Sequence, residues 1–232
     1  MTNQTVYIAT PCYNKSIPID YFECIVQTIF ALKHHGYNAI VNCRVGGPLL
    51  VQNRNTILYE FLESKAEFLM LIDDDTAWNA KDVINLVNKN LPVVGGVCPS
   101  KGNPTAFPFK PMLKNDNEVE VCNKTGLLKV EFVGPAFILL KRELIVEMYD
   151  TFTNLFYNQP DAEHFYSGSK EGPHRKICSL FKTEIENEDF IGEDVFFCNR
   201  IRELGYDILV DPFITLSHDG TVSCLAEKMM IS

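Results

Sequence analysis

The sequence has few of the features that mark secreted, membrane-spanning or nucleic-acid-binding proteins. No apolar run approaches the roughly 20 residues that a transmembrane helix needs, and the first residues contain no secretory signal. Lys and Arg number 21 against 30 Asp and Glu, so the formal net charge is −9. This charge repels phosphate on average, although charge alone leaves a nucleic-acid acceptor open. We therefore expect a cytoplasmic protein without a transmembrane segment.

The eight cysteines form no C-x-x-C pair, and several lie in apolar runs. This distribution predicts free thiols in a reducing compartment rather than disulfides or structural zinc. The sequence also lacks repeats, low-complexity tracts and an evident linker. Its 232 residues, 46% hydrophobic and 22% charged, are typical of a globular protein that buries a sizeable core. We expect one domain spanning residues 1–232.

The first 100 residues alternate between strand and helix patterns. We expect strands over 6–9, 37–45 and 68–72, and helices over 18–35 and 50–62. In the first helix, the apolar spacing places Phe22 and Phe30 on the core face with Ile25, Val26 and Ile29. The run at 68–72 is apolar throughout, as in a strand that is covered on both faces. This order predicts an α/β fold built on a doubly wound sheet flanked by helices.

The second half is less regular. We expect strands over 92–97, 136–140, 208–210 and 213–216, and a helix over 192–204 that ends at Gly205. A hairpin is expected between 119–121 and 127–133, around the turn at 123–126. Residues 99–111 and most of 151–190 are expected to form loops, and loops as long as the second are usually functional or disordered.

The strongest candidate for a chemical site is Asp73-Asp74-Asp75, directly after the apolar run at 68–72. Ligands of open α/β sheets bind beyond the carboxyl ends of the strands. Three adjacent carboxylates repel one another, and Mg²⁺ or Mn²⁺ would relieve that repulsion. The alternative is a polar strand end in which Asp caps the next turn. A haloacid-dehalogenase phosphatase fits less well, because the fourth position after Asp73 is Ala77 rather than Thr or Val.

Two further candidates lie near the C-terminus. Glu193 and Asp194 follow Gly192 where a helix is expected to begin. Either could act as a general base toward an acceptor hydroxyl, or both could simply stabilise the helix N-terminus. His218 follows a late strand, and an imidazole suits Mn²⁺ alongside carboxylates, although a structural hydrogen-bonding role is the commoner one.

Two weaker candidates complete the set. Gly134 precedes an expected strand. It either simply allows the chain to turn there or lets the backbone approach a ligand closely. Arg54, followed by Asn55, is either on a solvated helix face or able to reach a nucleotide or an acidic residue of the site.

In this order, the motifs resemble those of GT-A fold glycosyltransferases, especially small inverting family-2-like enzymes of large viruses and bacteria. The resemblance covers residues 5–220 and is carried by the following segments: Thr10-Pro11-Cys12-Tyr13-Asn14, Arg54-Asn55, Asp73-Asp74-Asp75, Val133-Gly134-Pro135-Ala136, Gly192-Glu193-Asp194 and His218. It implies a nucleotide-binding half over about 1–100 and an acceptor-binding half over about 101–232.

The resemblance also implies residue roles. Thr10, Pro11, Tyr13, Arg54 and Asp73 would contact the nucleotide sugar, expected to be a UDP-sugar. Mn²⁺ or Mg²⁺ would be bound by a set of three residues, Asp73, Asp75 and His218. Asp194 would be the general base of a single displacement, with Glu193 and Gly134 at the acceptor. The acceptor class stays open among a glycan, a lipid carrier, a protein and a modified nucleobase.

Two other functions compete with this one. A nucleotidyltransferase acting on sugar phosphates would use similar carboxylates, but it normally has a Gly- and Lys/Arg-rich loop after its first strand, which residues 9–14 lack. A non-catalytic carbohydrate-binding protein would not need the intact acidic motifs. In the segment 151–190 no motif aligns, and the candidates for acceptor contacts there are Phe165, Tyr166, His174, Arg175 and Lys176.

Overall fold

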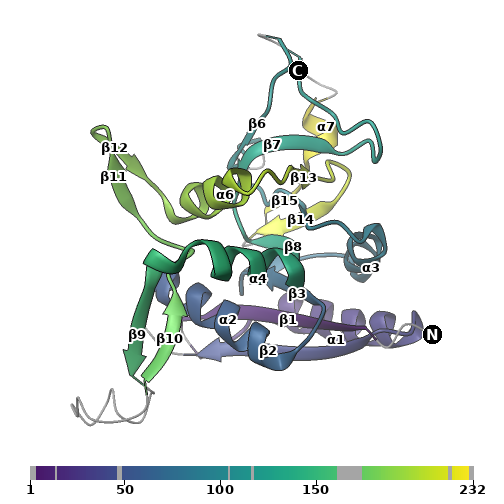
Figure 1. Ribbon diagram of the computed structural model, residues 1–232. Coiled ribbons are helices and arrows are strands. Elements are labelled where there is room, and N and C mark those ends of the chain that lie inside the picture. Colours follow the sequence, from purple (N-terminus) through teal and green to yellow (C-terminus); the bar gives the residue numbers. More distant parts are fainter. Residues whose placement is uncertain are drawn as a thin grey trace.

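The protein is a mixed α/β structure with one large sheet flanked by helices on both faces (Figure 1). The computed structural model describes residues 4–13, 15–45, 49–103, 105–115, 118–160, 174–218 and 221–229. The eight strands of the sheet follow the order β2-β1-β3-β8-β5-β13-β7-β6. The first three run parallel, and β8 enters antiparallel between β3 and β5. The expected large sheet flanked by helices is therefore present, and it is mixed.

The sheet strands are β1 (Thr5–Cys12), β2 (Asn38–Val45), β3 (Phe68–Ile72), β5 (Val93–Gly95), β6 (Phe109–Pro111), β7 (Leu128–Val133), β8 (Phe137–Lys141) and β13 (Ile208–Val210). Smaller sheets contain β4 (Thr76–Ala77), β9 (Phe156–Pro160), β10 (His174–Cys178), β11 (Glu184–Glu186), β12 (Asp189–Ile191), β14 (Thr215–His218) and β15 (Thr221–Cys224). The helices are α1 (Ile19–His34), α2 (Leu50–Ser64), α3 (Ala80–Lys89), α4 (Arg142–Thr151), the 3₁₀ turn η1 (Thr153–Leu155), α6 (Glu193–Glu203) and α7 (Leu225–Met229).

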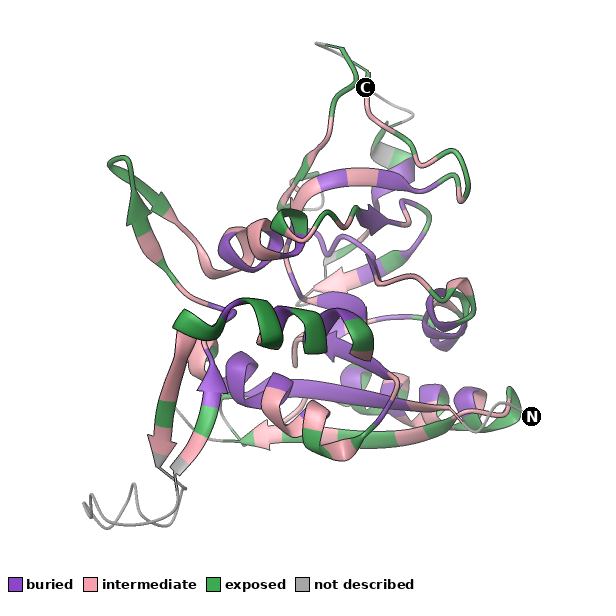
Figure 2. Cartoon of the chain, in the orientation of Figure 1, coloured by how far each residue is buried: buried purple, intermediate pink, exposed green. Residues whose placement is uncertain are grey.

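The alternation of side chains along β3 divides the core into two layers. Leu69 and Leu71 pack with α2, α4 and α6 on one face. Phe68, Met70 and Ile72 pack with α1 and α3 on the other. All five side chains are buried (Figure 2), which confirms that this apolar run is covered on both faces.

The helices α3 and α4, the turn η1 and the short helix α7 were not expected from the sequence. In α3, the Asn79 side chain caps the helix by accepting from the amide of Lys81, and the left-handed Asn90 ends it. Helix α4 follows β8 directly, with no Gly or Pro between Lys141 and Arg142 to mark the change from strand to helix. Within the described part of the chain, no helix is long and apolar enough to cross a membrane.

The prediction of a loop over 151–190 is wrong for its described residues. Strands β9 and β10 form one antiparallel pair, and β11 and β12 form a second pair that projects from the body beside α6 (Figure 1). Asn187 and Glu188 both have positive φ, as a tight two-residue turn requires. Residues 161–173, which include Phe165 and Tyr166, lie outside the described residues.

One local prediction is borne out and a second needs correction. The hairpin around residues 123–126 is present: Val121 bridges Leu128 antiparallel, and the amides of Cys122 and Lys129 donate to the carbonyls of Leu127 and Glu120. Strand β7 also pairs with β6 and β13, so it belongs to the main sheet as well. The predicted core face of α1 is rotated. Tyr21 and Thr28 are buried with Ile25 and Leu32, whereas Phe22 and Phe30 are exposed.

Candidate functional site

The sheet brings the first loop and the acidic triplet to one edge. Strands β1 and β3 are parallel neighbours, so the residues that follow them emerge side by side. Together with the start of α2 they line a cavity of about 270 Å³. Its lining consists of Pro11, Tyr13, Leu50, Asn53, Asp73, Asp74 and Asp75. A smaller cavity of about 110 Å³ lies on the other side of Asp75, against the start of α1.

Arg54 connects the two acidic motifs. Its Nη2 lies 3.0 Å from both carboxylate oxygens of Asp73, and its Nη1 donates to Glu193 Oε1 at 3.2 Å. The Arg54 residue is 3% exposed, so the helix position is buried and not a solvated face. A guanidinium can bind two carboxylates at once because its donors form a rigid fork. Residues that lie 139 positions apart are thereby held at one site.

The segment at Phe181 supports this arginine from below. The Asn55 side chain makes two hydrogen bonds to the backbone of Phe181. Its Nδ2 donates to the Phe181 carbonyl at 2.8 Å, and its Oδ1 accepts from the Phe181 amide at 2.7 Å. The Phe181 ring stacks on Phe197 of α6 and lies under the guanidinium of Arg54. A cation over an aromatic face is stabilised, and burial strengthens the effect. Asn55 is thus a positioning residue for the arginine beside it.

Strand pairing brings His218 to the acidic triplet. Strand β14 pairs antiparallel with the two-residue β4, and His218 is opposite Thr76. Its Nε2 lies 3.2 Å from Asp75 Oδ1, and its Nδ1 is 2.7 Å from the carbonyl oxygen of Pro99. That carbonyl can only accept, so the hydrogen bond requires a proton on Nδ1. A neutral ring then presents its Nε2 lone pair to the triplet, whereas a ring protonated at both nitrogens donates from Nε2 to Asp75.

Lys101 forms an ion pair with the second carboxylate oxygen of Asp75. Its Nζ lies 2.5 Å from Asp75 Oδ2. Burial raises the pKa of Asp75, but its hydrogen bonds and charge interactions with Lys101 and His218 outweigh burial and hold the pKa below its usual value. The neighbouring Asp74 behaves in the opposite way, because burial and the charges of Asp75 and Asp73 raise its pKa.

The donors suit a divalent cation in part. Asp75 and His218 supply an oxygen and an imidazole nitrogen that converge, and the Pro99 carbonyl orients the ring as the outer partner of a metal-bound histidine does. Asp73, the third expected ligand, faces Arg54 in this arrangement. Among the described residues, no three His, Cys, Asp or Glu side chains gather as a ligand set. Asp75 and His218 therefore fit a cation that takes its remaining ligands from a bound anion or water.

Three other predicted site residues lie away from the cavity lining. The Thr10 hydroxyl hydrogen-bonds Tyr21 of α1 within the core. The Asp194 carboxylate accepts from the amide of Val195 at 2.7 Å in the first turn of α6. Gly134 follows β7, and a methyl group built there would meet only Pro108, at 3.9 Å. Packing within the chain therefore does not require glycine at position 134.

Sequence reasoning missed several members of the site. Lys101 lies in a segment that was expected to be a loop, and its signal was weak because a lone surface lysine is common. Leu50, at the start of α2, and Asn53, directly before Arg54, also line the cavity. Leu50 lies four residues before Arg54, and this spacing on one helix could have indicated it. Asn14 lies outside the described residues, as does the side chain of His174.

Comparisons by sequence identify no relative. No protein-family model matches the chain, and no curated protein matches it. Solved structures with a similar arrangement include A197 from STIV, with 15% identity and a TM-score of 0.49, where the match covers 93% of this chain and 85% of that one.

Two further structures are similar over different shares of the chain. One is a glycosyltransferase involved in glycosylation of the major capsid of PBCV-1, with 13% identity and a TM-score of 0.34, covering 62% of this chain and 63% of that one. The other is a nucleoside-diphosphate-sugar pyrophosphorylase from Vibrio cholerae RC9, with 10% identity and a TM-score of 0.38, covering 90% and 72%. At these identities and scores the similarities carry no information on substrate or mechanism.

Proposed function

We propose that this chain is a GT-A fold glycosyltransferase that transfers a sugar from a nucleoside-diphosphate sugar, such as a UDP-sugar, to an acceptor hydroxyl. The observation that carries the proposal is the buried Arg54, which joins Asp73 of the acidic triplet to Glu193 at the start of α6. This contact supports a single site built from two motifs that are distant in the sequence. The cavity of about 270 Å³ at the ends of β1 and β3 lies beside this site and supports the binding of part of a nucleotide there.

In this proposal the half of the chain over about 1–100 binds the donor. Pro11 and Tyr13 line the cavity and would hold the nucleoside, while Asp73, oriented by Arg54, would accept hydrogen bonds from a ribose or sugar hydroxyl. The side chains of Asp75 and His218 would hold Mn²⁺ or Mg²⁺. When bound, such a cation supplies Lewis-acid stabilisation of the departing diphosphate.

The acceptor would bind on the side of residues 101–232, toward the N-terminus of α6. The acceptor oxygen attacks the anomeric carbon, the bond to the diphosphate oxygen breaks, and Asp194 takes the hydroxyl proton as general base. Glu193 would hold the acceptor while its other interaction, with Arg54, fixes its position. Gly134 would leave room for the acceptor near α6. A single displacement of this kind inverts the configuration of the sugar.

The proposal is tested by incubating the protein with Mn²⁺, a panel of nucleotide sugars and glycan, lipid-carrier, peptide and modified-nucleobase acceptors. Release of a nucleoside diphosphate with transfer of the sugar is the expected result. Formation of a nucleotide sugar with release of pyrophosphate, from a nucleoside triphosphate and a sugar phosphate, would instead identify a nucleotidyltransferase. Saturable carbohydrate binding with no turnover of any donor would identify a non-catalytic binding protein.

We expect UDP to bind more tightly with Mn²⁺ than in EDTA, and Asp75→Ala and His218→Ala each to weaken the Mn²⁺-dependent part by about 10-fold or more. The two side chains contact each other, so both substitutions should lower the same quantity, the gain in UDP affinity that Mn²⁺ provides. Isothermal titration calorimetry measures the affinities, with circular dichroism to verify the fold. A His218→Ala protein with wild-type Mn²⁺ dependence would make the histidine structural.

We expect Lys101→Gln to tighten Mn²⁺ binding in the absence of nucleotide by about 2- to 5-fold, because the ammonium group competes for Asp75. Calorimetry with Mn²⁺ alone measures the change. Lys110→Gln is the control, because it removes a similarly exposed lysine that pairs with Glu131 on the β6–β7 edge. Equal Mn²⁺ affinity in the Lys101→Gln and wild-type proteins would exclude the competition.

A further inference from the structure

One edge of the main sheet is long and open. Strand β2 has eight residues, and within the described ranges β1 is its one partner. The opposite edge is the three-residue β6, which carries Lys110 and Pro111, two features that discourage further strand pairing. Strand β2 contains no proline, and its one charged side chain, Arg44, points toward Glu60 on α2. Half of the backbone groups of β2 are thus available to another strand.

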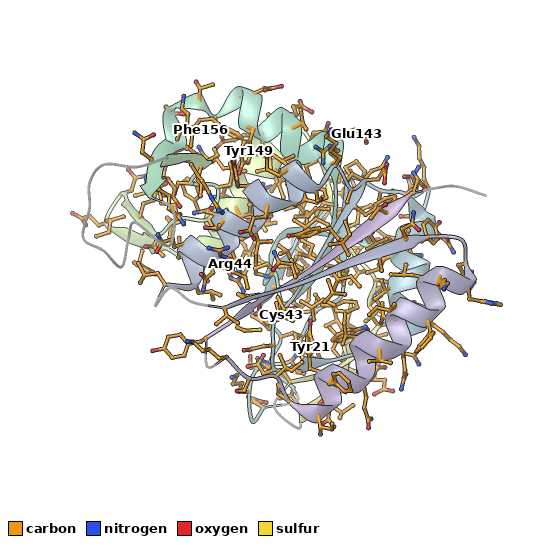
Figure 3. All side chains as sticks on the ribbon, turned by 90° about the horizontal axis from the view of Figure 1, so that it is seen from below. Tyr21, Cys43, Arg44, Glu143, Tyr149 and Phe156 are labelled. Carbon is orange, nitrogen blue, oxygen red and sulfur yellow. The ribbon has the colours of Figure 1, made fainter. Side chains whose placement is uncertain are left out.

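Apolar side chains cover one face of this open edge. Asn42 donates to Tyr7 and to Glu60 on the α2 side, so Val41 and Val45, of the opposite parity, face the α1 side. Both valines are exposed, and so is Cys43 between them. Figure 3 shows β2 from below with α1 on one side of it.

The flank of α1 above β2 is apolar as well. Cys24 and Thr28 contact Trp78 on the flank toward α3. At 100° per residue, Phe22 lies about 90° and Val26 about 130° from the centre of the buried face of α1, on the flank opposite α3. Phe30 lies further round, at the outer rim of this flank. Phe22 is 51% exposed and Phe30 is 70% exposed. Exposed aromatic side chains on a helix beside an open strand with exposed valines are the kind of apolar grouping that often marks an interaction surface.

The charges and the lengths of α1 and β2 indicate what covers this surface. The exposed acidic residues Asp20 and Glu23 lie in the first half of α1, and Lys33 and His34 lie at its end. A copy of α1 running antiparallel would place opposite charges together. Helix α1 is about 24 Å long and β2 is about 26 Å long, so two copies paired along β2 would set two helices of matching length beside each other.

We propose that the β2 edge and the α1 flank form the interface of a homodimer. Strand β2 pairs antiparallel with β2 of a second copy about a two-fold axis perpendicular to the sheet, which joins the two sheets into one. The same axis brings both α1 helices to one face, where Phe22 and Phe30 of each copy pack against the other copy. The two cavities then lie at opposite ends of the joined sheet, because each lies at the carboxyl end of β1.

Sedimentation equilibrium of the wild-type protein and of the double variant Phe22→Lys/Phe30→Lys tests the interface. We expect a wild-type dimer and at least about a 100-fold rise in its dissociation constant in the double variant, which would have to bury four charges. Phe190→Lys is the control, because Phe190 is 73% exposed on β12, away from β2. The Phe190→Lys protein should stay dimeric. A monomeric wild-type protein would overturn the proposal. So would a dissociation constant of Phe190→Lys as high as that of the double variant.

The antiparallel arrangement has its own test. Glu23→Lys and Lys33→Glu should each weaken the dimer, and their combination should restore much of the affinity because the charges are exchanged in both copies. A combined variant as weak as the single variants would overturn the arrangement. These measurements need no donor or metal, so their outcome is independent of glycosyltransfer. Thermal unfolding verifies that each variant is folded.

Discussion

Asp194→Asn should lower turnover about 10²- to 10⁴-fold while donor affinity stays near the wild-type value. Asn preserves the size of the side chain and an oxygen that can accept from the Val195 amide, but it cannot take the acceptor proton. The loss should therefore fall on kcat rather than on the dissociation constant of the donor. Steady-state kinetics and calorimetry with the donor identified from the panel measure the two quantities.

The alternative for Asp194 is stabilisation of the N-terminus of α6, since its carboxylate lies in the first turn and accepts from the amide of Val195. Substitution by Asn would then cost only about 0.3–1 kcal/mol of helix stabilisation, with little effect on turnover. Asp189→Asn on β12 is the matched control for removing a nearby carboxylate, and it should leave kcat unchanged. A product that retains the anomeric configuration of the donor, measured by NMR, would remove Asp194 from the role of base even if the variant were inactive.

Local patterns predicted the parts of the fold that local physics determines. Strand β3 was predicted with its observed bounds. Five consecutive apolar residues that end at three carboxylates fit a short buried strand better than any other element. The same pattern drew attention to the acidic triplet after it, and the role of that triplet stays a prediction. Neither Arg54 nor Lys101 could be assigned a partner in this way. The partners of Arg54 lie 19 and 139 residues away, so its burial depends on how α2 and α6 pack.

Helix α1 illustrates a different limit. The apolar count favoured a core face containing Phe22 and Phe30, but the sheet and Trp78 bury Tyr21 and Thr28 through hydrogen bonds. Polar side chains with buried partners therefore outweigh larger apolar ones in choosing the face. Apolar periodicity identified the helix correctly but could not separate a core face from an interface. The pairs β9–β10 and β11–β12 were missed because their strands are short and mostly polar.

Arg54→Met should lower the free energy of unfolding by about 2–3 kcal/mol and the melting temperature by about 5–10 °C. Met preserves most of the packing volume near Phe181 but leaves Asp73 and Glu193 facing each other without a cation. Because both carboxylates are about a quarter exposed, the cost is below that of a fully buried pair. Chemical denaturation followed by circular dichroism measures the free energy.

The control for Arg54→Met is Arg44→Met, which removes an arginine from Glu60 while Arg175 and Asn42 still bind that carboxylate. It should cost less than about 1 kcal/mol. Neutralising both partners in Arg54→Met/Asp73→Asn/Glu193→Gln should recover part of the stability lost in the single variant, because no unpaired charge remains. Arg54→Lys should be intermediate, since one ammonium group cannot reach two carboxylates with fork geometry. If Arg54→Met were as stable as wild type, the arginine would not be holding the two motifs together, and Asp73 and Glu193 would have to be positioned by the packing of β3 and α6 alone.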